Sequence, residues 1–302
     1  METEQTPLDP KAPDRLRIGT CRSLLEWVFE NIEDWTAGKD KDGAALILVS
    51  IFARSARTYE AIVRCLGERG FGEQGLMLNR SLFEDMIDAH WVSMNRDLAV
   101  QRLHQHDLYS RLLRADTQRK YARWFDGRKP PSVKMSNEER KELRLLFGRL
   151  GSGSWTGISG LDDRVKSVKE YWEPEDQKSL LFWHDWVHKF MNEVLHPSAF
   201  SLGRLGAPTV HEDDNNRESF EWHFGSTKEW LKYSLHAAFW AFGQSVSLVI
   251  DEFAPENRSA FAERETQGNQ AFRNASHWEK TGRLEAAPED GVMPPETPAD
   301  DE

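Results

Sequence analysis

The charged residues best placed to do chemistry lie in a mostly apolar stretch around Arg80. Glu84 follows Arg80 by four residues, the spacing at which two side chains meet on one face of a helix. The neighbouring positions on that face are apolar: Leu76, Met77, Phe83 and Ile87. A charge in such surroundings is costly unless it is paired. We therefore predict that Arg80 and Glu84 pair, or that both face a polar pocket.

A second group of polar residues recurs at four-residue steps near the middle of the chain: His184, His188, Asn192 and His196. Histidines four residues apart on a helix can ligate a metal, but no glutamate lies between them in H-E-x-x-H form. We therefore interpret them as one polar helix face and expect no metal. His196 directly precedes Pro197. It either ends a helix by bonding carbonyl groups or acts as a general acid or base.

The sequence lacks the common motifs of nucleophilic catalysis and nucleotide binding. There is no G-x-S-x-G elbow, and the Gly-rich stretch 151–160 has no lysine in the position a P-loop requires. We interpret 151–160 as a loop and expect no cofactor.

A basic segment could hold phosphate groups. It carries five cations and two aromatic residues: Arg111, Arg114, Arg119, Lys120 and Arg123, with Tyr121 and Trp124. Clustered cations neutralise a phosphate backbone. The alternative interpretation is a solvated helix face whose aromatic residues turn inward.

The formal net charge of −11 is concentrated at the two ends of the chain. Residues 279–302 hold eight acids and two bases, and residues 1–14 hold four acids and one base. Residues 15–278 therefore carry only −2. Residues 111–169 hold fifteen bases and seven acids, a local excess of +8. The acidic total thus does not exclude an anionic partner.

The two cysteines, Cys21 and Cys65, have no metal-type spacing and suit a reducing compartment. The N-terminal residues lack the basic start and apolar run of a signal peptide. Residues 233–250 are free of charge but include a histidine, a glutamine and several serines. We interpret this segment as a buried helix rather than a membrane span. The sequence predicts a soluble, cytoplasmic protein with no stable membrane insertion.

Helical periodicity recurs through most of the chain, and no stretch alternates with a period of two. The predicted helices cover residues 15–35, 44–68, the stretch containing Arg80, 98–125, the residues after Ser136, 162–172, 174–196 and 226–253. Ser136 and Glu139 have the spacing of a capping box. We predict an all-α multi-helix bundle with long antiparallel helices in a single domain, 15–265. We expect residues 1–13 and the acidic residues 266–302 to be disordered.

Several of these residues together resemble a known family. The run L-N-R-S-L-F-E, which contains Arg80 and Glu84, follows F-A-R-S-A, which contains Arg54. These runs, with S-W-T-G-I-S around Trp155 and the N-E-V-L-H-P-S run of Asn192 and His196, resemble the bacterial helical family called domain of unknown function 5677. The resemblance covers about 44–202. Asn192 stands where a serine is commoner in the family. The resemblance implies an all-α fold and a shared polar centre, and no particular reaction.

Two hypotheses for function follow. The first is a binding or regulatory module whose Arg/Glu/His centre is structural or recognises a small anionic ligand. In it, Arg54, Trp155 and Asn192 are the expected ligand-binding residues. The second is a metal-independent RNase, or nucleotide-acting enzyme, of a bacterial defence or toxin system.

In the second hypothesis His196 is the acid or base, Arg80 stabilises charge and Glu84 orients Arg80. The sequence leaves open whether the protein is an enzyme. The expected partners are a small anionic ligand or RNA, and a second copy of the chain in a homodimer.

Overall fold

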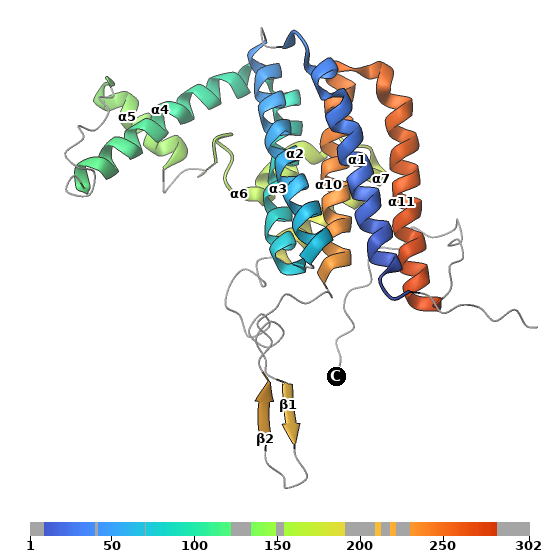
Figure 1. Ribbon diagram of the computed structural model, residues 1–302. Helices are drawn as coiled ribbons and strands as arrows, with labels where there is room; N and C mark the ends of the chain where they lie inside the picture. Colours follow the sequence, from blue (N-terminus) through green and yellow to red (C-terminus); the bar gives the residue numbers. More distant parts are fainter. Residues whose placement is uncertain are drawn as a thin grey trace, which may run out of the picture. The chain divides into compact units, whose positions relative to one another are not determined.

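Most helices of the protein begin and end close to the positions that apolar periodicity predicts, but the helix at 258–281 was not predicted (Figure 1). The computed structural model describes residues 9–39, 42–69, 71–121, 134–148, 154–190, 209–212, 218–221 and 230–282. The long helices are α1 (Ala12–Thr36), α2 (Gly43–Arg69), α3 (Gly72–Met94), α4 (Arg96–Lys120), α10 (Leu231–Phe253) and α11 (Arg258–Thr281). The shorter ones are α5 (Asn137–Phe147), α6 (Gly160–Lys169), α7 (Pro174–His184), the π-helix η3 (Asp185–Phe190) and the 3₁₀ turn η5 (Pro255–Asn257). The fold is an all-α helical bundle, as predicted.

Contacts divide the chain into two units that are not continuous in sequence. Unit 1 comprises Met1–Ala37, Phe52–Met86 and Leu181–Glu302. Unit 2 comprises Gly38–Ile51 and Ile87–Leu180. Helices α2 and α3 each contribute residues to both units. The single domain expected from the sequence stays a prediction.

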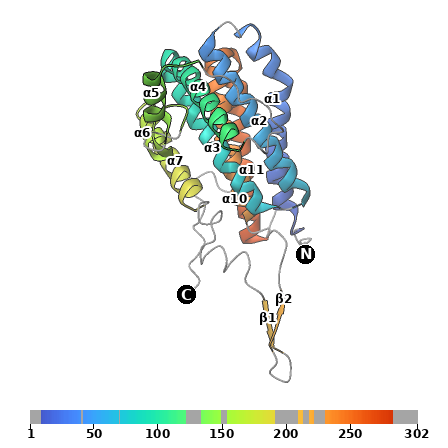
Figure 2. The same cartoon turned by 90° about the vertical axis from the view of Figure 1, so that its left-hand side faces the viewer.

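Unit 1 is built on long helices that lie side by side. Helices α1, α10 and α11 pack against one another, as the two views show (Figures 1 and 2). The ring of Tyr59 on α2 stacks on that of Phe242 on α10, with 4.2 Å between centroids. Gly72 at the start of α3 allows a close approach to α10, because a Cβ there would lie 2.9 Å from the backbone nitrogen of Leu231. The charge-free segment 233–250 is accordingly a packed helix of this core.

An ion pair joins the two ends of the chain that unit 1 brings together. Arg17 of α1 is only 1 % exposed, and its guanidinium donates to both carboxylate oxygens of Glu279 on α11 at 2.6 and 2.8 Å. Ser276 accepts a further hydrogen bond from Arg17 at 3.3 Å. This pairing requires α11 to continue well beyond residue 265, where the sequence analysis places the end of the helical domain. Four buried positions hold this part of the helix in the core: Phe261, Gly268, Phe272 and Ala275.

In unit 2, α4 and α5 lie side by side (Figures 1 and 2). Tyr109 of α4 packs with Leu143 and Phe147 of α5 in a small core. Helix α5 begins with the predicted capping box. The Ser136 hydroxyl accepts from the backbone N–H of Glu139 at 3.1 Å, and the Glu139 carboxylate accepts from the backbone N–H of Ser136 at 2.7 Å. These bonds satisfy two backbone donors that a helix start leaves without partners.

The prediction that the chain contains no strand is wrong in one place. Strands β1 (Thr209–Glu212) and β2 (Glu218–Glu221) form an antiparallel pair in which Val210 lies opposite Phe220. Four residues are too few to show a convincing alternation of apolar and polar positions. Among the described residues, no helix is both long and apolar enough to cross a membrane.

Candidate functional site

The arginines singled out in the sequence pair with carboxylates of α3 in unit 1. Arg80 Nε lies 3.2 Å from Glu84 Oε1, the pairing that the four-residue spacing predicts. Arg54 of α2 donates through Nε to Asp85 Oδ2 at 2.9 Å, and its Nη2 pairs with Asp85 Oδ1. This second pair links residues 31 positions apart.

The two ion pairs differ in the solvent exposure of their side chains. The side chain of Asp85 is 4 % exposed, so the guanidinium of Arg54 above it compensates a buried carboxylate. The side chains of Arg80 and Glu84 are 34 % and 32 % exposed, at the edge of the apolar face rather than within it. Solvent therefore screens the Arg80–Glu84 pair, and its contribution to stability is modest.

Asp88 of α3 organises a buried polar cluster in unit 2. Its Oδ2 accepts from the indole N–H of Trp155 at 2.8 Å, and its Oδ1 accepts from Arg164 of α6 at 2.6 Å. Trp91 packs edge-on against Trp155, with 5.6 Å between ring centroids. These interactions anchor the segment before α6 and give Trp155 a structural role. The ligand-binding roles expected for Trp155 and Arg54 stay predictions.

The row of polar residues that follows Trp183 is only partly described. His184 is buried, and its Nδ1 lies 3.5 Å from Asp185 Oδ1. The α-helix predicted for this stretch ends at His184 and a π-helix follows, which changes the hydrogen-bonding step from four residues to five. Hydrogen bonding at five residues still brings a four-residue step back close to the same side of the helix, so the single polar face stays a prediction.

The remaining predicted site residues, Asn192 and His196, lie outside the described residues. The meeting of Arg80, Glu84 and His196 in one centre stays a prediction. Within the described parts of the chain, no three His, Cys, Asp or Glu side chains are grouped as a metal site requires.

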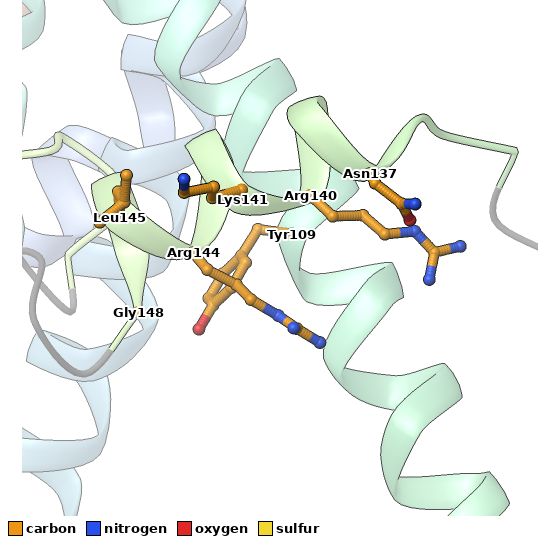
Figure 3. A pocket seen from close by; sticks show the side chains of 7 residues that line it. All are labelled: Tyr109, Asn137, Arg140, Lys141, Arg144, Leu145 and Gly148. Carbon is orange, nitrogen blue, oxygen red and sulfur yellow. The ribbon is translucent and has the colours of Figure 1, made fainter.

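A pocket of about 550 Å³ lies between α4 and α5 in unit 2 (Figure 3). Seven residues line this α4–α5 pocket: Tyr109, Asn137, Arg140, Lys141, Arg144, Leu145 and Gly148. Three of them are cations and none is an acid. In Figure 3 the side chains of Arg140 and Arg144 extend along one side of α5, whereas Lys141 points the other way.

Around the pocket, cationic side chains outnumber acidic ones. Asp116 of α4 accepts from Arg144 at 3.1 Å and lies 3.3 Å from a guanidinium nitrogen of Arg119, so one carboxylate serves two arginines. No ion-pair partner of Lys141 lies among the described residues. The two segments that border the pocket are 109–121 at the end of α4 and 134–148 around α5. Together they hold eight bases and four acids.

The basic cluster of α4 was predicted from the sequence, but its combination with the cations of α5 was not, because nothing local shows that the two helices pack together. The available signal was the capping box at Ser136, which places Arg140 and Arg144 one turn apart on a helix. Guanidinium groups at this spacing can hold an oxyanion through several charge-assisted hydrogen bonds.

Comparisons with known proteins bear on the family. No significant match was found to a curated protein or to a solved structure. A family model described as "Family of unknown function (DUF5677)" matches residues 45–217, which is more than half of the chain. The match includes Arg54, Arg80, Glu84 and Trp155, on which the resemblance was based. The chain therefore belongs to the DUF5677 family.

Proposed function

We propose that this protein is a helical binding module for a small anionic ligand, and that the ligand binds in the α4–α5 pocket. The observation that carries this proposal is the composition of the lining, in which Arg140, Lys141 and Arg144 occur with no acid. Asn137 adds an amide that can donate to the same ligand. An anion beside Arg140 and Arg144, which extend along one side of α5, reduces the mutual repulsion of their two charges.

A phosphate-class oxyanion suits this lining best. A guanidinium presents two parallel N–H donors that match two oxygens of a phosphate or carboxylate. The pocket is open to solvent. Exposed cations of one sign also speed the encounter with an anion.

The lining supports binding rather than catalysis. Its seven residues include no histidine, carboxylate or cysteine, the groups that most often act as general bases or nucleophiles. The metal-independent RNase predicted as the alternative requires Arg80, Glu84 and His196 in one centre, and that arrangement stays a prediction.

Calorimetric titration with inorganic pyrophosphate tests the proposal. We expect the wild type to bind, and the double variant Arg140→Gln/Arg144→Gln to bind at least about tenfold more weakly for each guanidinium removed, because a hydrogen bond to a charged group contributes roughly 1.5–3 kcal/mol. Arg64→Gln is the matched control, because Arg64 is also an exposed helical arginine paired with a carboxylate, Glu60. Circular dichroism establishes that each variant is folded.

Two results would count against the proposal. Equal affinity of the wild type and the double variant would place the anion elsewhere. Cleavage of RNA by metal-free wild type, abolished in His196→Ala, would favour the enzymatic alternative.

A further inference from the structure

The cations at the α4–α5 pocket continue beyond it along the end of α4. Arg119 is joined to Arg144 through Asp116, and Lys120 follows Arg119 in the sequence. The side chains of Arg119 and Arg144 are 53 % and 57 % exposed. The basic surface is therefore longer than one small anion needs, and its cations are open to a ligand that crosses both helices.

An exposed aromatic ring lies at the same end of α4. Tyr121 directly follows the helix and is 43 % exposed. The ammonium group of Lys120 lies 5.1 Å from the centroid of its ring. Nucleic-acid bases stack on exposed aromatic rings, and a cation beside the ring favours both the stack and the adjacent phosphate.

Part of the apolar surface of α4 and α5 is covered where the two helices pack together. Tyr109 is packed with Leu143 and Phe147 in the small core between the helices. An interfacial membrane helix needs a broad apolar face to insert between lipids. Beside its cations and the Tyr121 ring, the exposed surface here has two leucines, Leu113 and Leu145. Two leucines do not make a broad apolar face, and the cations with the ring fit a chain of phosphates that carries bases.

We infer that the α4–α5 hairpin binds single-stranded nucleic acid, with phosphates on Arg140, Arg144 and Arg119 and a base on Tyr121. This inference rests on the proposed function and names the ligand class of the same pocket. Single strands are favoured over duplexes, because only an unpaired base presents its face for stacking on Tyr121.

Fluorescence anisotropy with a labelled single-stranded RNA of about 12 nucleotides tests the inference. We expect affinity to fall as salt rises from about 50 to 200 mM, and each phosphate that the protein neutralises should contribute about 0.7 to the slope. Arg119→Gln/Arg144→Gln should reduce this slope. Tyr121→Ala should weaken binding about tenfold with the slope unchanged, since stacking involves no counterion release. Arg64→Gln should match the wild type.

The outcomes separate this inference from the proposed function. Binding of pyrophosphate without binding of RNA overturns the inference and leaves the proposed function standing. Failure to bind either ligand overturns both. RNA binding that neither variant changes, or preferential binding to vesicles of anionic lipid, also overturns the inference.

Discussion

Arg164 donates a hydrogen bond to Asp88 across 2.6 Å, and the two side chains are only 8 % and 5 % exposed. A buried pair of this kind contributes little net stability when it is compared with apolar residues of similar size. Removal of one partner is nevertheless strongly destabilising, because it leaves the other charge buried without its pair. The Trp155 indole shares the same carboxylate. The cluster therefore fixes the position of α6 against α3 within unit 2.

Arg164→Ala should destabilise the protein by about 3–5 kcal/mol, because Asp88 then keeps a buried charge without its ion pair. Arg80→Ala should cost no more than about 1 kcal/mol, since solvent screens the Arg80–Glu84 pair. Urea unfolding followed by circular dichroism measures both effects. Equal destabilisation would show that the burial of the two pairs does not determine their importance.

Glu279→Ala should destabilise the protein by about 1.5–3 kcal/mol, because Arg17 loses the carboxylate that receives two of its hydrogen bonds and keeps the longer contact to the Asp14 carboxylate at 3.4 Å. Glu263→Ala on the exposed side of α11 is the control, and it should change the free energy of unfolding by less than about 0.5 kcal/mol. If Glu279→Ala is as stable as the control, the pairing of α1 with α11 through Arg17 is not required.

Gly268→Ala should cost about 1–3 kcal/mol through overpacking, because the new Cβ would lie 2.2 Å from the ring of Phe239. Gly19→Ala should instead stabilise α1 by about 0.5–1 kcal/mol, since nothing lies within 4 Å of a Cβ there and alanine favours a helix. Thermal unfolding of the two variants distinguishes these opposite signs. A stabilising Gly268→Ala would mean that the ring of Phe239 moves aside readily.

Stability should fall in mild acid because of His236. Burial lowers the pKa of this imidazole to about 4, and the charge of Arg17 adds to the shift. The centroid of its ring lies 5.1 Å from that of Trp183 and 5.0 Å from that of Phe272. The folded state holds the neutral form, whereas the unfolded chain takes up a proton near pH 6.5. The contribution of the neutral His236 to the free energy of unfolding is therefore complete above about pH 6.5. It is lost progressively as the pH falls toward 4.

The variant His236→Gln isolates this effect. Between about pH 6.5 and 4 it should lose less stability than the wild type, by up to about 3 kcal/mol. The free energy of unfolding at several pH values gives the comparison. Parallel curves for the two proteins would refute the assignment to His236.

Local signals in the sequence predicted most of the fold. The capping box of Ser136 and Glu139 depends on residues three positions apart, and the helices follow from apolar periodicity. Helix α11 was not predicted, because its few apolar positions are separated by polar residues. Its helical state depends on interactions with α1, such as that between Glu279 and Arg17, which lie 262 positions apart in the sequence.

In the candidate site, too, contacts within one helix were predictable and contacts between distant residues were not. The Arg80–Glu84 pair was predictable because it lies within one helix. The partners of Asp88 were not, since Trp155 and Arg164 are 67 and 76 residues away. The α4–α5 pocket likewise depends on tertiary packing, which a single sequence does not reveal. The change from α-helix to π-helix after His184 was also not apparent from the four-residue spacing of His184 and His188.

The division of α2 and α3 between the two units limits how the chain can be shortened. Each unit is interrupted by segments of the other, so no single cut separates them into whole pieces. A fragment reduced to the family match, 45–217, would also lack α1, α10 and α11, including the ring of Phe242 on which Tyr59 stacks. The ends of the family match therefore do not coincide with the ends of either unit, and we expect a fragment cut at those ends to lose part of the core of unit 1.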